Sequence, residues 1–185
     1  MFPELSLHIL DVAENSVRAN ASLIAIEVLA DTAGDLLTIS IEDDGCGMDE
    51  QMAAQVSDPF FTTRTTRKVG LGVPLFRFAA QAAGGWFRLS STPGRGTRVE
   101  VAFILSHIDR MPLGDITGCV HDLIVFHPKV DFLFTYSYNG KSFQLDTRQM
   151  RALLGGVALD TPEVSDWIRE YLREQKEETD QGAVF

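Results

Sequence analysis

Residues 36–48 read LLTISIEDDGCGM, and this stretch decides the fold. Its first half is rich in branched apolar residues, which are typical of a β-strand. It ends in a run of acids, Glu42 to Asp44, followed by Gly45 and Gly47. A carboxylate at a strand end can accept a hydrogen bond from an exocyclic amine, and neighbouring glycines let the backbone approach a flat ring. The stretch therefore predicts a strand that ends at an adenine pocket.

Upstream of this strand, residues 5–18 have the apolar period of a half-buried helix. Asp11, Asn15 and Arg18 are spaced by four and then three residues, so they form a row along one side of that helix. An amide oxygen can ligate a hard cation that bridges phosphates, and a neighbouring carboxylate can orient water or accept a proton. The row predicts a magnesium and phosphate end for the same pocket.

Downstream, residues 58–72 form a polar and basic loop in an otherwise acidic protein. The loop carries Arg64, Arg67 and Lys68 and ends in Gly-Leu-Gly before a helical pattern over residues 73–83. Positive charge and backbone amides ahead of a helix favour anionic oxygens. Taken singly, such a loop is more often a solvated surface, but adenine, metal and phosphate elements together predict a nucleoside triphosphate site.

The remaining predicted elements of the first 106 residues are a short helix around residues 50–56 and three strands. Residues 22–30 form a strand before the decisive stretch, and residues 86–91 and 98–105 form a pair joined by the turn TPGRGT, in which proline and glycines favour chain reversal. From about residue 107 the pattern changes to an apolar stretch, a hairpin with an Asn-Gly turn, and helices over 148–154 and 162–178. We therefore divide the chain into residues 1–106 and 107–185, and we expect the tail EETDQGAVF to fray.

Composition narrows the function classes. The chain has 185 residues, 45% of them hydrophobic, and a net charge of −10, which argues against a general binder of nucleic acid or of anionic membranes. Cys46 and Cys119 form neither a disulfide framework nor a zinc motif. No apolar run is long enough for a membrane span, and no signal peptide pattern is present. A cytoplasmic protein is expected.

Together the motifs resemble the ATP-binding domain shared by sensor histidine kinases, gyrase B, the Hsp90 chaperones and MutL. HILDVAENSVRA is similar to the family's N-box, DDGCG to its adenine-binding box, DPFFTT to its F-box, and GLG and GRGT to its second and third glycine boxes. The resemblance covers residues 5–105. It implies an α/β two-layer sandwich of the Bergerat type, with a mixed, largely antiparallel sheet and helices on one face, plus a small C-terminal α+β appendage.

The resemblance also implies ligands, ATP and Mg²⁺, and roles for individual residues. Asn15 would ligate Mg²⁺, Asp43 would bind the adenine amine, and Arg18 would contact phosphate. Asp11 stands where hydrolytic members place a catalytic Glu that is one methylene longer. The other residues implied around the nucleotide are Gly45, Gly47, Met48, Phe60, Arg67, Lys68, Gly70, Leu71, Gly72 and Thr97.

Only a few residues precede the helix that resembles the N-box, so we expect no phosphoacceptor hairpin and no self-phosphorylation of the usual kind. His8 is expected to be a packed residue, and Cys46 a spacer. Three functions remain open: a kinase acting on a separate protein, a slow ATPase that switches conformation, and an ATP sensor without turnover. Residues 107–185 would then pack against the first unit, bind the partner protein, or form a homodimer.

Overall fold

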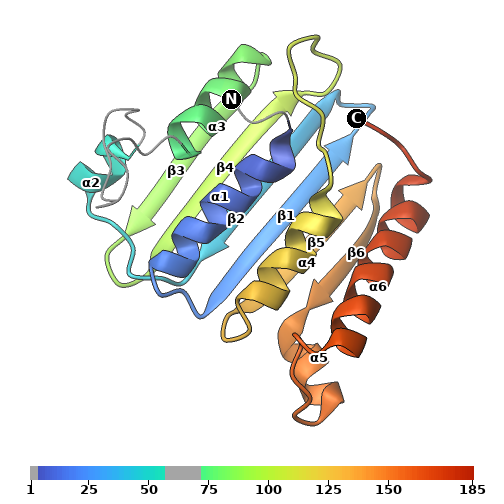
Figure 1. Cartoon of the computed structure of the whole chain (residues 1–185). Coiled ribbons are helices and arrows are strands. Elements are labelled where there is room, and N and C mark those ends of the chain that lie inside the picture. Colours follow the sequence, from blue (N-terminus) through green and yellow to red (C-terminus); the bar gives the residue numbers. More distant parts are fainter. Residues whose placement is uncertain (1–3, 57–71) are drawn as a thin grey trace.

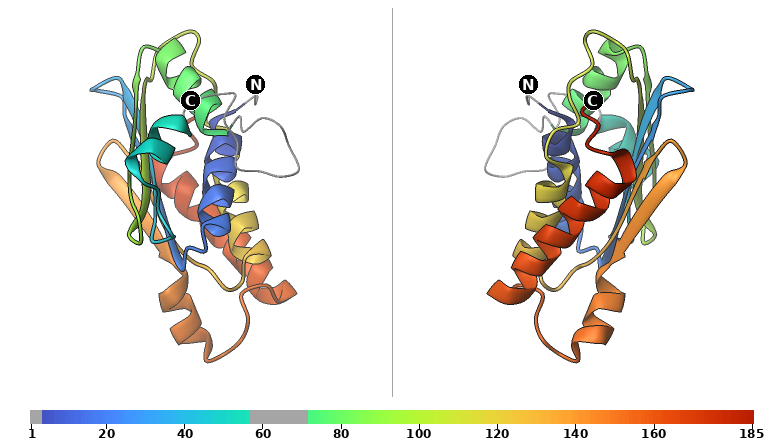
Figure 2. Two further views of the ribbon diagram at one scale, coloured as in Figure 1. Left: turned by 90° about the vertical axis from the view of Figure 1, so that its left-hand side faces the viewer. Right: turned by 90° about the vertical axis from the view of Figure 1, so that its right-hand side faces the viewer.

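The structure is a computed structural model that describes residues 4–56 and 72–185, and it contains one sheet with helices on one face (Figures 1 and 2). The strands are β1 (Leu23–Asp31), β2 (Leu36–Asp43), β3 (Trp86–Thr92), β4 (Gly96–Ile104), β5 (Asp131–Tyr138) and β6 (Lys141–Asp146). The helices are α1 (Leu5–Arg18), α2 (Glu50–Gln55), α3 (Gly72–Ala82), α4 (Ile116–Phe126), α5 (Thr147–Leu154) and α6 (Pro162–Asp180). None of these helices combines the length and the apolar character needed to cross a membrane.

The sheet has the strand order β3-β4-β2-β1-β5-β6. Neighbouring strands run antiparallel except β1 and β5, which are parallel. Figure 2 shows α1, α3, α4 and α6 on the same side of this sheet. The predicted α/β sandwich with a mixed, largely antiparallel sheet is confirmed.

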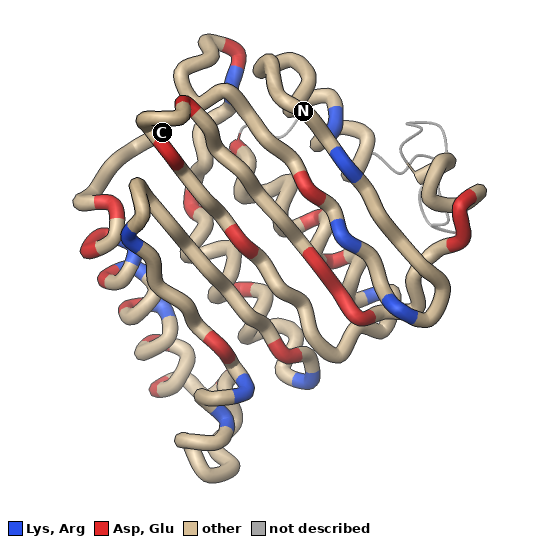
Figure 3. Tube along the Cα trace, turned by 180° about the vertical axis from the view of Figure 1, so that it is seen from behind, with Lys and Arg blue, Asp and Glu red and all other residues tan. Residues whose placement is uncertain are grey.

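The two faces of the sheet differ because side chains alternate along each strand. On β1, Ile24, Ile26 and Val28 are buried beneath the helices. Figure 3 views the molecule from the opposite side of the sheet and marks the positions of charged residues along the strands. On this face of β2 the side chains of Thr38, Ser40 and Glu42 alternate with the buried Ile39 and Ile41. The register places Arg88 beside Glu100 there, and the row continues across the sheet through Ser40, Glu27 and Thr135.

Residues 107–185 extend the same sheet. β5 pairs with β1, and β5 side chains such as Phe132 and Phe134 belong to one buried cluster with Ile24 of β1. The apolar stretch that had no assigned structure from the sequence, GCVHDLIVF, lies in α4, whose Val120 and Leu123 are buried. The sheet and its core are therefore continuous across residue 106.

The prediction that the C-terminal tail frays is wrong. Helix α6 continues to Asp180, whose buried carboxylate accepts hydrogen bonds from the Tyr136 hydroxyl and the Lys176 ammonium, each at 2.7 Å. Beyond the helix, the carbonyl of Phe185 accepts a hydrogen bond from the backbone N–H of Leu113 at 2.8 Å. The contacts with Tyr136 and Leu113 join the tail to distant parts of the chain, and the composition of the tail does not reveal them.

Candidate functional site

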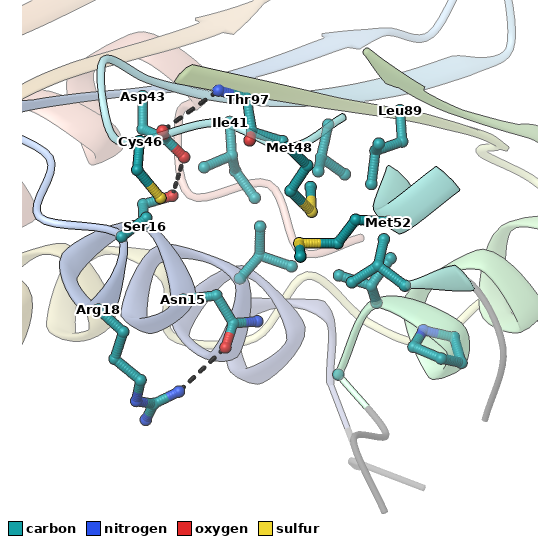
Figure 4. A pocket seen from close by; sticks show the side chains of 18 residues that line it. Asn15, Ser16, Arg18, Ile41, Asp43, Cys46, Met48, Met52, Leu89 and Thr97 are labelled. Carbon is teal, nitrogen blue, oxygen red and sulfur yellow. Dashed lines mark hydrogen bonds between the residues drawn. The ribbon is translucent and has the colours of Figure 1, made fainter. Parts of the chain in front are cut away.

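A cavity of about 270 Å³ opens between α1, the end of β2 and the beginning of α3 (Figure 4). This volume lies just below the range of typical small-molecule pockets, roughly 300–1,000 Å³. Some of the residues that line it belong to the sequence motifs and others to the neighbouring parts of the sheet, α2 and α3: Val12, Asn15, Ser16, Arg18, Ala19, Ile41, Asp43, Cys46, Gly47, Met48, Met52, Val56, Gly72, Val73, Pro74, Leu89, Thr97 and Val99.

The three consecutive acids at the end of β2 have three different environments. Glu42 points to the open face and pairs with Arg98 at 2.5 Å. Asp43 points the other way, into the cavity. Asp44 accepts hydrogen bonds from the Ser22 hydroxyl and from two backbone N–H groups at the start of β1. Burial works against ionisation of Asp44, but these hydrogen bonds hold its pKa below the usual value. Strand alternation therefore leaves Asp43 as the one acid of the three in the cavity.

Asp43 is almost fully buried and held by three donors. Its Oδ1 accepts the backbone N–H groups of Gly45 at 2.9 Å and of Thr97 at 3.2 Å. Its Oδ2 accepts the Ser16 hydroxyl at 2.5 Å. A carboxylate offers about four acceptor positions, so these bonds leave roughly one, on Oδ2. An amine entering the cavity can use that position.

Beyond Asp43, the loop before α2 is fitted closely against the β3–β4 turn. Gly47 has φ +63°, and a Cβ added there would lie 2.0 Å from the carbonyl oxygen of Thr92. The backbone N–H of Met48 donates to the Ser91 hydroxyl at 2.8 Å, which in turn lies 2.9 Å from the Thr97 hydroxyl. A side chain at position 47 would push this loop away from the strands, so glycine is required there.

The walls between these polar groups are apolar. Ile41, Leu89 and Val99 line the side formed by the sheet. Figure 4 shows the thioether side chains of Met48 and Met52 close to one another in the cavity. Aliphatic and thioether groups make favourable contacts with the face of an aromatic ring. The cavity therefore suits a flat heterocycle whose edge carries a hydrogen-bond donor.

Asn15 and Arg18 line the cavity from α1, and Figure 4 shows them on a different wall from Asp43. The Arg18 guanidinium donates to Asn15 Oδ1 at 2.9 Å, and about half of the Arg18 side chain is exposed. An amide oxygen fits the preference of Mg²⁺ for oxygen, since this ion typically takes one or two protein ligands and completes its shell with phosphate and water oxygens. Asn15 is thus the residue that could hold the metal, and the guanidinium beside it could pair with phosphate.

Asp11 lies beside the start of α3. A Cβ added to Gly72 would lie 1.7 Å from Asp11 Oδ2, so the carboxylate packs against the α-carbon of this glycine. A negative charge near a helix N-terminus is favourable because the first backbone N–H groups point toward it. Asp11 is not among the described residues that line the cavity.

The structure brings together many of the residues predicted from the sequence. Those that line the cavity are Asn15, Arg18, Asp43, Gly47, Met48, Gly72 and Thr97. Gly45 supports Asp43 through its N–H group. The other predicted contacts, Phe60, Arg67, Lys68, Gly70 and Leu71, lie outside the described residues. The roles of all these residues remain predictions.

Sequence reasoning missed Ser16, which holds Asp43. The signal was present, because Ser16 falls one turn after Val12, on the apolar side of α1 and away from the row that contains Asn15. A polar residue on a buried stripe needs a partner. Here the partner is a carboxylate 27 residues away, which sequence spacing does not indicate.

A family model described as "Histidine kinase-, DNA gyrase B-, and HSP90-like ATPase" matches residues 3–107. The chain belongs to this family. Among its curated relatives, "Sensor protein kinase FleS" of Pseudomonas aeruginosa is 37% identical over 108 residues, which are 58% of this chain and 26% of that protein. "Signal transduction histidine-protein kinase AtoS" of Escherichia coli is 45% identical over 58 residues, 31% of this chain and 9% of that protein. The chain thus spans about a quarter or less of the length of these relatives.

Solved structures show the same fold. The "Aquifex aeolicus MutL ATPase domain complexed with ADP" superposes with a TM-score of 0.52 at 13% identity, over 84% of this chain and 70% of that chain. The "N terminal domain of a DNA repair protein" superposes with a TM-score of 0.51 at 17% identity, over 78% and 53%. A match over 84% of the chain includes part of residues 107–185, so the likeness of fold extends beyond the segment matched by the family model.

Proposed function

We propose that this member of the family binds Mg-ATP in the cavity, with the adenine amine on Asp43 and the phosphates toward Arg18. Asn15 would ligate Mg²⁺, whose positive charge would offset part of the negative charge of the phosphates. The observation that carries the proposal is the acceptor position left on Asp43 Oδ2, in an apolar cavity that also presents the Asn15 amide oxygen. Membership of an ATPase family supports it.

Asp43→Asn is expected to weaken ATP binding by about 1–3 kcal/mol, because a charge-assisted contact in a buried pocket is lost. Calorimetric titration of the full chain with ATP measures this change. GTP should bind the native protein more weakly than ATP, since guanine presents a carbonyl oxygen where adenine presents its amine.

Glu42→Gln is the matched control for Asp43→Asn, because Glu42 is the adjacent acid on the opposite face of the sheet, paired with Arg98. Its ATP affinity should equal that of the native protein. Equal affinities for ATP in the native and Asp43→Asn proteins would show that adenine does not bind there.

Ser16→Ala is expected to lower ATP affinity by about 1 kcal/mol, the value of a typical net hydrogen bond, because Asp43 loses a donor that orients it. Ser6→Ala provides a control on the same helix, since Ser6 is also buried but bonds to Glu4. In an Asp43→Asn background the effect of Ser16→Ala should shrink. An undiminished effect there would mean that Ser16 does not act through Asp43.

For the activity, we propose transfer of the terminal phosphoryl group to a residue of a separate protein. The names of the sensor kinases among the relatives support this reaction class. Residues 107–185 offer a surface for the partner, where Trp167, 54% exposed, stacks on Tyr171 at 5.2 Å. A second copy of the chain is the alternative partner for this surface, and sedimentation tests whether the protein dimerises.

Labelled Mg-ATP distinguishes this activity from hydrolysis and from sensing. Phosphoryl transfer predicts label on a candidate partner from the neighbouring genes, with little free phosphate. Free phosphate that disappears in Asp11→Asn would instead identify a slow ATPase with Asp11 as the base. The Asn15→Ala variant, which lacks the proposed metal ligand, sets the background. If the native protein forms no more labelled partner and no more free phosphate than this variant, it senses ATP without turnover.

A further inference from the structure

A chain of polar contacts joins the second half of the protein to the metal end of the cavity. His127, the residue that caps the C-terminus of α4, donates from Nε2 to Glu14 Oε1 at 2.7 Å. The other oxygen of Glu14 lies 3.8 Å from Arg18 Nη2. Arg18 Nη1 donates to Asn15 Oδ1 at 2.9 Å. Glu14, Asn15 and Arg18 are all on α1, so His127 is the member of this chain that comes from residues 107–185.

The contact between Arg18 and Asn15 conflicts with metal binding at the same oxygen. A divalent cation on Asn15 Oδ1 would repel a guanidinium that also bonds this atom, so Arg18 has to move away when Mg²⁺ binds. It then has two anionic partners available, a phosphate in the cavity and the Glu14 carboxylate. A stronger attraction between Glu14 and Arg18 therefore weakens the pairing of Arg18 with the phosphate.

We propose that His127 is a positioning residue for Mg-nucleotide binding, because it holds the Glu14 carboxylate toward α4 and thereby limits its pairing with Arg18. In the structure, Glu14 is within hydrogen-bonding distance of His127, at 2.7 Å, whereas its separation from Arg18 is 3.8 Å. The inference rests on the proposed function, since it presumes that Mg-nucleotide binds in the cavity.

The expected effect is moderate, because the side chains of His127, Glu14 and Arg18 are 21%, 31% and 51% exposed. Partly exposed ion pairs have small coupling energies because water screens them. We therefore expect changes of about two- to fivefold in affinity.

His127→Leu should weaken Mg-ATP binding about two- to fivefold and leave the binding of adenosine without magnesium unchanged. Glu14→Gln, which removes the competitor for Arg18, should bind Mg-ATP at least as tightly as the native protein. The double variant should behave as Glu14→Gln does, because His127 acts only through Glu14. His127→Gln, which keeps a hydrogen-bond donor, should recover part of the loss. Calorimetric titration measures each affinity.

His107→Leu is the matched control, since His107 has a similar exposed fraction, 31%, and its Nδ1 accepts the backbone N–H of Asp109 at 3.1 Å. Circular dichroism establishes that each variant is folded. Three results would overturn the inference: unchanged Mg-ATP affinity in His127→Leu, an equal loss for adenosine without magnesium, or the full loss of His127→Leu persisting in the double variant. The proposed function has a separate test: it would be refuted if the native protein bound no adenine compound. The three variant results above overturn only the role of His127 and not the proposed function.

Discussion

Asp180→Ala is expected to lower the free energy of unfolding by roughly 2–4 kcal/mol, because it leaves the buried Tyr136 hydroxyl and the Lys176 ammonium without their acceptor. The Asp180 side chain is fully buried, whereas Lys176 is 24% exposed, so water replaces part of the lost interaction. Burial and then the hydrogen bond to Asp180 raise the pKa of Tyr136, which therefore stays a neutral donor. Urea denaturation at neutral pH measures the change.

Asp166→Ala is the control for this substitution. Asp166 also forms an ion pair on α6, with Arg169 at 3.4 Å, but its side chain is 76% exposed. Removing an exposed pair should change stability by less than about 0.5 kcal/mol. If the two substitutions cost the same, the contacts of Asp180 do not stabilise the C-terminal segment.

Acidification from pH 7 to pH 5 is expected to cost roughly 2 kcal/mol of stability through His8 alone. Burial lowers the pKa of His8 from 6.5 to about 4, and the Asp11 carboxylate acts in the opposite direction without cancelling this shift. The folded protein therefore holds fewer protons than the unfolded chain between these two values. The stabilising contribution is complete above about pH 6.5 and is lost as the pH falls toward 4.

His8→Phe tests this origin, because phenylalanine does not titrate and can preserve the stacking on Phe76, at 5.3 Å between ring centroids. The free energy of unfolding of His8→Phe should depend less steeply on pH between 7 and 5 than that of the native protein. His107→Phe, at a partly exposed position, should retain the native slope. Identical slopes in the native and His8→Phe proteins would exclude His8 as the cause.

The sequence by itself determined the local elements and the chemistry at their ends. The period of α1 places Asn15 and Arg18 on one side of a helix. Strand alternation directs Asp43 into the cavity and Glu42 away from it. These features depend on residues a few positions apart, whose geometry the backbone imposes. Local geometry therefore predicted the individual elements, while the two-layer sandwich was implied by the resemblance of the motifs to a known family.

Only the tertiary structure decided which distant elements become neighbours. The parallel pairing of β5 with β1, the Ser16–Asp43 hydrogen bond, the Glu14–His127 contact and the anchoring of the tail by Asp180 each join residues far apart in the chain. Such contacts form when apolar faces from separate segments pack and bring particular polar atoms within reach. Helical and strand periods describe each segment alone, so they specify which side is buried but not which residue lies opposite.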